Sequence, residues 1–161
     1  MKNKIKYLFV LLILLNLPFN FNAAYAAGGS GGDDKTNLYK DGKKLVYRAK
    51  KLEKKNKIEK AQKLYLKAYK KFAKAYSKDK KNADVLNYLG FTLRKTGNLE
   101  KAEIFYLKGL DLDAAHLGIN EYLGELYVQT NRIDLAKKRL AVLQDCKCEE
   151  YDELKELIEN K

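Results

Sequence analysis

Few residues of this sequence could take part in covalent or metal chemistry. The 161 residues contain one histidine, His116, and no serine or cysteine stands at a recognisable catalytic spacing from it. Because nucleophilic and metal sites need several convergent groups, we expect His116 to be a loop residue without a chemical role. Residues 28–32 lack the spacing of a phosphate-binding loop, and the acidic stretches 111–113 and 149–153 lack that of a calcium loop. The sequence therefore predicts no enzyme, no catalytic residue, no metal site and no cofactor.

Two cysteines, Cys146 and Cys148, are separated only by Lys147. In an oxidising compartment two otherwise isolated thiols should not both stay reduced, so a disulfide between them is our first expectation. So short a ring stabilises a fold by only about 1–2 kcal/mol, which limits its use to fixing a local bend. Redox catalysis, metal binding by the two sulfurs, and free or intermolecularly paired thiols remain alternatives.

The N-terminal segment predicts export. Three lysines, an apolar run over residues 7–17 and the sequence Ala24-Tyr25-Ala26 follow the order of a signal peptide. A membrane span needs roughly 20 apolar residues, more than this run provides. We expect residues 1–26 to be a cleaved signal peptide of a bacterial protein that becomes periplasmic or secreted. An uncleaved anchor is the alternative.

Positive charge is concentrated in the first half of the chain. The chain has 33 Lys and Arg against 21 Asp and Glu, a formal net charge of +12, and 19 of the basic residues lie between residues 35 and 81. This asymmetry indicates either the solvated faces of helices or a surface for an anionic partner. Tyrosines interleaved with the lysines fit nucleic-acid stacking in principle. Because export removes that ligand, we expect no nucleic acid, and no small-molecule substrate is evident.

The elements that position these residues are predicted to be helices. Residues 27–41 have a Gly/Ser-rich start and are predicted to be a flexible linker. Beyond them the chain contains no proline, and apolar residues recur at spacings of three and four over residues 42–161. These patterns predict one all-α domain after the linker.

Small residues recur at a fixed interval in this domain. Leu89-Gly90 returns 34 residues later as Leu123-Gly124, and Ala102 returns as Ala136. Small side chains at such positions let antiparallel helices approach closely, where larger ones would overpack the crossing. Between the paired helices, equivalent positions carry residue types that tolerate a left-handed helix end: Asn56, Gly97 and Asn131.

The series Leu89-Gly90, Leu93, Gly97, Ala102, Tyr106, Gly109 resembles a tetratricopeptide repeat. The resemblance implies a short right-handed α-solenoid of about three helix-turn-helix repeats, over residues 42–82, 83–116 and 117–148. A helix over residues 149–160 carries apolar residues on one face and is predicted to cap the last repeat. The sequence departs from the family pattern at Leu86, Gly109 and Ala114, where the family favours Trp, Ala and Pro.

The resemblance also implies function. Family members bind proteins or peptides in a concave groove, and the matching groove positions here include Lys50, Asn87, Phe91, Arg94, Glu121 and Glu125. Phe91 and Arg94 are the expected anchors, although a solvated face without function is an equal interpretation. We therefore expect a non-enzymatic protein–protein interaction module or scaffold of the bacterial cell envelope. The alternative is an electrostatic binder of an anionic membrane surface or envelope polyanion through the basic first repeat.

Overall fold

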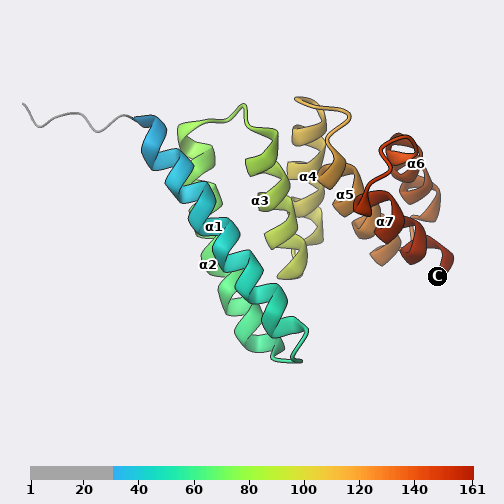
Figure 1. The fold of residues 1–161 in the computed structure, drawn as a ribbon, viewed down its shortest axis with the longest axis horizontal. Helices are drawn as coiled ribbons and strands as arrows, with labels where there is room; N and C mark the ends of the chain where they lie inside the picture. Colours follow the sequence, from blue (N-terminus) through green and yellow to red (C-terminus); the bar gives the residue numbers. More distant parts are fainter. Residues whose placement is uncertain (1–30) are drawn as a thin grey trace, which may run out of the picture.

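The computed structural model describes residues 31–161, with side chains from residue 34 onward. Within this range the chain forms helices and no strand (Figure 1). The helices are α1 (Gly31–Glu53), α2 (Ile58–Lys78), α3 (Ala83–Lys95), α4 (Leu99–Leu110), α5 (Leu117–Gln129), α6 (Ile133–Leu143) and α7 (Glu149–Glu159). They form three helical hairpins in a row, closed by α7, which confirms the predicted all-α repeat solenoid. The predicted signal peptide, residues 1–26, lies outside the described residues.

The turns inside the three hairpins follow the predicted chemistry. Asn56, Gly97 and Asn131 all have positive φ, at 54°, 87° and 60°. This left-handed conformation ends the first helix of each hairpin and lets the chain reverse. The predicted second and third units begin at Ala83 and Leu117, where α3 and α5 begin.

The recurring small residues serve two different contacts. At Gly90, a Cβ atom would lie 2.5 Å from the ring of Tyr106, so α3 and α4 can approach only without a side chain there. At the equivalent Gly124, a Cβ atom would instead meet the side chain of Leu154 on α7. The sequence therefore predicted a close approach correctly at both positions. In the last repeat, however, the space is taken by the capping helix.

The prediction of a flexible linker over residues 27–41 is wrong from Gly31 onward, where α1 begins. Tyr39 packs its ring edge-on against Phe72, with the centroids 6.0 Å apart. Salt bridges join Asp41 to Lys71 at 3.1 Å, Lys35 to Asp79 at 3.0 Å, and Asp34 to Lys78. The physical reason is the length of α2, whose final turns give the start of α1 an apolar and charged surface to pack on.

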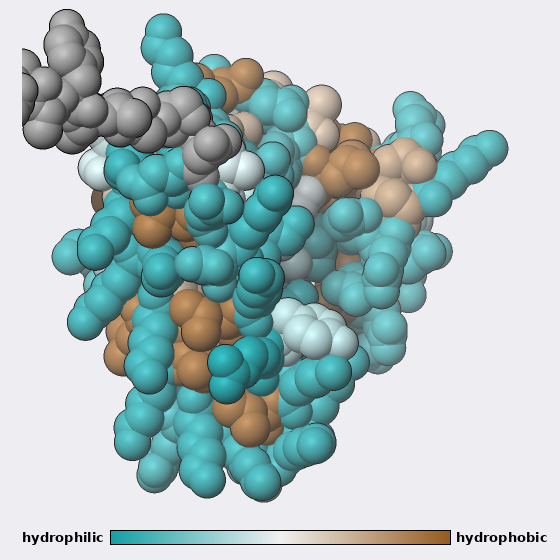
Figure 2. All heavy atoms as spheres, turned by 60° about the vertical axis from the view of Figure 1, so that its left-hand side comes forward, coloured by the Kyte–Doolittle hydropathy of each residue, from teal (hydrophilic) through white to brown (hydrophobic). Residues whose placement is uncertain are grey.

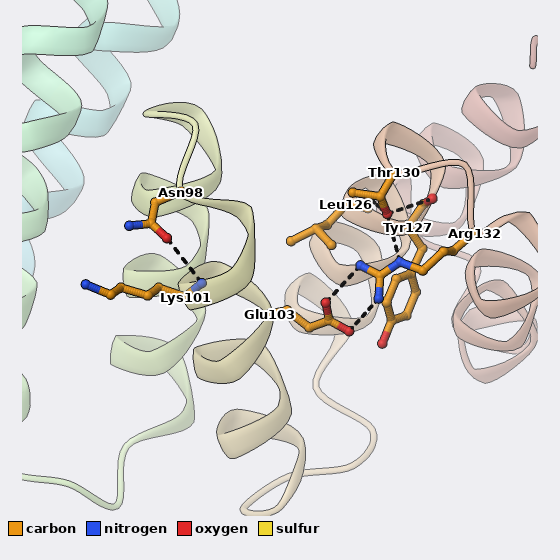
Figure 3. A network of polar contacts seen from close by, with 7 residues as sticks. All are labelled: Asn98, Lys101, Glu103, Leu126, Tyr127, Thr130 and Arg132. Carbon is orange, nitrogen blue, oxygen red and sulfur yellow. Dashed lines mark hydrogen bonds and ion pairs between the residues drawn. The ribbon is translucent and has the colours of Figure 1, made fainter.

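A partly exposed ion pair joins the second and third hairpins (Figure 3). The Arg132 guanidinium donates two hydrogen bonds to the Glu103 carboxylate on α4, at 2.9 and 2.8 Å. Its Nε donates a third to Thr130 Oγ1 at 2.9 Å, and Thr130 in turn donates to the backbone oxygen of Leu126. This bidentate geometry fixes the turn after α5 against α4.

The core runs through the whole solenoid. The first hairpin and α3 bury one apolar cluster, and α4 to α7 bury a second together with Leu93 of α3. Partly buried side chains of Tyr69, Phe105 and Tyr122 pack against both, so the repeats share one continuous interior. Among the described helices, none is both long and apolar enough to cross a membrane.

The bend between α6 and α7 contains the two cysteines. Cys146 and Cys148 are joined by a disulfide, with their Cα atoms 5.2 Å apart. Lys147, inside the ring, has a φ of 49°. The bond therefore closes the tight turn from which α7 starts.

Candidate binding groove

The first helices of the three hairpins, together with α7, enclose an open cavity of about 430 Å³. We call it the groove cavity. Its lining residues come from α1, α3, the α4–α5 turn, α5 and α7: Tyr39, Lys43, Asp84, Asn87, Tyr88, Asp113, Ala115, His116, Leu117, Gly118, Glu121, Tyr122 and Glu150. Because every repeat contributes to it, the cavity exists only in the assembled solenoid.

Aromatic rings form much of the wall of the groove cavity. The Tyr88 ring stacks on Phe72 at a centroid distance of 5.0 Å and lies 5.7 Å from Tyr39. Lys43 Nζ lies 5.4 Å from the centroid of Tyr39 and 6.0 Å from that of Tyr88. These separations suit cation–π attraction, so a cation already rests on the rings.

Three of the predicted groove residues lie at or next to the groove cavity. Asn87 and Glu121 line the groove cavity, although both side chains are largely buried in its wall. Lys50 is exposed, and its Nζ lies 5.1 Å from the Phe91 centroid and 3.4 Å from the Tyr122 hydroxyl. The structure thus brings Asn87 and Glu121 together at the cavity, with Lys50 one step further along the groove.

The predicted anchors Phe91 and Arg94 do not line the groove cavity, because Phe91 is buried and Arg94 is largely buried. Phe91 is 2% exposed and packs between the rings of Tyr65 and Tyr122, at centroid distances of 5.7 and 4.8 Å. The Arg94 side chain is 9% exposed and forms a salt bridge of 2.6 Å with Glu125. Rings from the neighbouring repeats therefore cover Phe91, while Arg94 lines a separate cavity of about 310 Å³ between α3, α5 and the end of α7.

Three carboxylates meet where α7 crosses α5. Oxygens of Glu121, Glu125 and Glu153 all lie within 4.8 Å of one another. Burial, then hydrogen bonding to Glu153 and the charges of Glu125 and Glu153, raise the pKa of Glu121 to about 9. Arg94 on α3 neutralises Glu125, and the charge of Lys50 on α1 acts in the opposite direction by lowering the pKa of Glu121. At neutral pH a proton therefore occupies this cluster.

This cluster predicts a specific pH dependence of stability. The folded pKa of Glu121 lies above its unfolded value, so its protonation contributes fully to stability below pH 4.5, and this contribution is lost progressively as the pH rises to about 9. We expect Glu121→Gln, which keeps a neutral side chain of the same size, to raise the free energy of unfolding at pH 9 by at least about 1 kcal/mol. At pH 4.5 the substitution should have little effect.

Urea unfolding of both proteins at the two pH values would measure this difference. Glu100→Gln, an exposed substitution on α4, is the control and should show no such pH dependence. An equal effect of Glu121→Gln at both pH values would contradict the proposed protonation.

Several residues of the groove cavity were not predicted from the sequence. Tyr88 and Tyr122 are 34 residues apart, so the repeat spacing itself could have identified them as equivalent wall residues. Tyr39 lies in the segment assigned to the linker. His116, predicted to have no chemical role, has a structural one: its Nδ1 accepts a hydrogen bond from the Ile119 N–H at 3.2 Å, and its Nε2 lies 3.5 Å from Asp84 Oδ1.

Comparison with known proteins adds family and fold information. Residues 64–104 match the family model of the tetratricopeptide repeat. No curated protein matches the sequence significantly. Among solved structures, the Yersinia enterocolitica type III secretion chaperone SycD, in complex with a peptide of the translocator YopD, is 19% identical. Its TM-score is 0.51, over 73% of this chain and 86% of that one.

The second TPR domain of human RPAP3, in complex with the HSP70 peptide SGPTIEEVD, is also 19% identical. Its TM-score is 0.51, over 79% of this chain and 97% of that one. At this identity the likeness concerns the fold. The comparisons therefore show a tetratricopeptide-repeat match in residues 64–104 and the same kind of helical-repeat fold around it.

Proposed function

We propose that this chain is a non-enzymatic interaction module that binds a segment of a partner protein in the groove cavity. The observation that carries the proposal is the cavity itself, which all three hairpins and α7 line with aromatic and polar side chains. SycD and the RPAP3 domain, which have the same kind of fold, are seen in complex with peptides. We place the module in the bacterial cell envelope, on the predicted signal peptide and on a disulfide that suits an oxidising compartment.

Site-specific photo-crosslinking in the source cells tests this proposal. A photoreactive residue in place of Lys43, which lines the groove cavity, should give a discrete adduct with a partner protein. The matched control is the same residue in place of Lys108, an exposed lysine on α4 that does not line the cavity. Adducts at position 108 with none at position 43 would contradict groove binding.

A second candidate function has its own observation, the uncompensated charge of α2. Lys60, Lys63, Lys67 and Lys70 are exposed at helical spacing on this helix, and none of them forms an ion pair in the described part of the chain. The acids Asp34, Asp41 and Asp79 are already paired with other lysines. Figure 2 looks onto this end of the molecule, where hydrophilic side chains surround small apolar patches. Such a face would attract anionic headgroups.

Vesicle sedimentation separates this candidate from groove binding. If α2 binds membranes, the protein should sediment at low salt with vesicles that contain phosphatidylglycerol. The triple variant Lys63→Glu, Lys67→Glu, Lys70→Glu should no longer sediment with them. Raising the salt concentration should have the same effect, since exposed charges are screened. Lys137→Glu with Lys138→Glu on α6 is the control. Unchanged sedimentation of the triple variant would exclude α2 as the binding face.

A further inference from the structure

We infer that the groove cavity selects its partner segment by a basic side chain, a lysine or an arginine, which enters between the tyrosines and the carboxylates of the wall. This inference rests on the proposed function, because it names the chemistry of the segment that the groove binds. Four properties of the groove cavity support it: the charge of the wall, a free hydrogen-bond acceptor, the aromatic faces and the available space.

The charge of the cavity is opposite to that of the chain. The protein as a whole has a formal net charge of +12. The wall of the cavity nevertheless contains three acidic side chains, Asp84, Asp113 and Glu150, besides the protonated Glu121, and Lys43 is its one Lys or Arg side chain. An acidic segment would meet repulsion from this wall, whereas a basic side chain would find complementary charge.

These four carboxyl groups are distributed around the cavity. Among the described residues, the group of acids close enough to hold one metal ion is Glu121, Glu125 and Glu153, which includes only one of the four. Acids spread over a cavity of about 430 Å³ suit an extended cationic side chain better than a single ion. This spacing points to a ligand with a long stem and a charged end.

An unsatisfied acceptor lies in the same wall. Asn87 is 5% exposed, and its side-chain oxygen Oδ1 has no hydrogen-bond partner. Gly118 leaves room for the amide group, since a Cβ atom there would lie 2.8 Å from Asn87 Nδ2. A buried carbonyl oxygen without a donor is costly, and an ammonium or guanidinium group has several donors. Asn87 therefore favours a donor-rich ligand.

Lys43 shows where a cation rests in this cavity. Its Nζ lies over the rings of Tyr39 and Tyr88, at 5.4 and 6.0 Å from their centroids. The residue is exposed, so its flexible side chain can leave the rings when a ligand cation takes its place. Lys43 thus competes with the ligand, and its removal should strengthen binding.

Binding of degenerate peptide pools to the immobilised full-length chain tests the inference. The pools are nonamers with Arg, Lys, Gln or Glu fixed at the central position and every other position randomised. We expect the Arg and Lys pools to be retained roughly fivefold better than the Glu pool. Non-specific attraction to a chain of charge +12 would produce the opposite order, so the result is informative.

Three variants assign the preference to the cavity. Asp84→Asn with Glu150→Gln should reduce retention of the Arg pool about fivefold, while Lys43→Gln should raise it about twofold. The control is Glu100→Gln with Asp134→Asn, which removes two exposed carboxylates outside the cavity and should change nothing. Circular dichroism of each variant checks that the helices are retained.

Two results would overturn the inference while leaving groove binding intact. The first is preferential retention of the Glu pool, and the second is weaker retention of the Arg pool by Lys43→Gln. If instead no pool is retained and a photoreactive residue at position 43 gives no adduct in cells, the proposed function fails, and this inference fails with it.

Discussion

Replacing Phe91 by alanine should lower the free energy of unfolding by about 3–5 kcal/mol, the usual cost of removing a buried aromatic side chain. Phe91 is 2% exposed and contacts rings from the first and third hairpins, Tyr65 and Tyr122. Its removal would therefore leave a cavity at the junction of all three repeats. Since single domains are stable by roughly 5–15 kcal/mol, the loss should appear as a large shift of the urea midpoint.

The matched control is Tyr47→Ala, which removes an aromatic side chain that is 61% exposed on α1. We expect this control to change the free energy of unfolding by less than about 1 kcal/mol. Equal midpoints for the two variants would show that Phe91 does not join the repeats. If Phe91→Ala destabilises the chain as expected, a loss of partner binding by this variant reflects the loss of the folded groove, because the Phe91 side chain is buried.

The fold could be predicted from the sequence because it repeats. The 34-residue interval between Gly90 and Gly124 fixed the pairing of helices, and Asn56, Gly97 and Asn131 have the left-handed conformation expected of them. The start of α1 could not be predicted in this way. Its residues look like a linker by composition, and they are helical because the long α2 offers a surface to pack on.

The groove was only partly predictable, because burial depends on what neighbouring repeats contribute. The repeat pattern assigns both Asn87 and Phe91 of α3 to the groove. In the structure Asn87 lines the cavity, whereas Phe91 is buried beneath it. The difference is due to Tyr65 and Tyr122, which belong to other repeats and cover Phe91. Local spacing does not contain this information.

The acidic side of the cavity was missed for a related reason. Asp113 comes from the turn before α5 and Glu150 from α7, so neither occupies a groove position of a first helix. In the sequence they appear as solvated helix ends. Only the packing of α7 across α5 brings Glu150 to the same cavity as Asp84. The capping helix therefore completes the site as well as the core.

The second large effect concerns this capping helix. Leu154 on α7 is fully buried and occupies the space above Gly124, where a Cβ atom would collide with it. We expect Leu154→Ala to lower the free energy of unfolding by about 2–5 kcal/mol, the cost of an unfilled cavity in the core. Loss of this contact should also increase hydrogen exchange in α7 before the rest of the solenoid unfolds.

Leu157→Ala provides a matched control on the same helix, because Leu157 is 39% exposed while the composition of α7 changes identically. Its effect on stability should be under about 1 kcal/mol, and hydrogen exchange of α7 should stay close to that of the unmodified chain. If Leu154→Ala and Leu157→Ala behave alike, α7 is a tail with no sealing role. If Leu154→Ala alone releases α7, the peptide preference should weaken with it, because Glu150 leaves the groove cavity together with the helix.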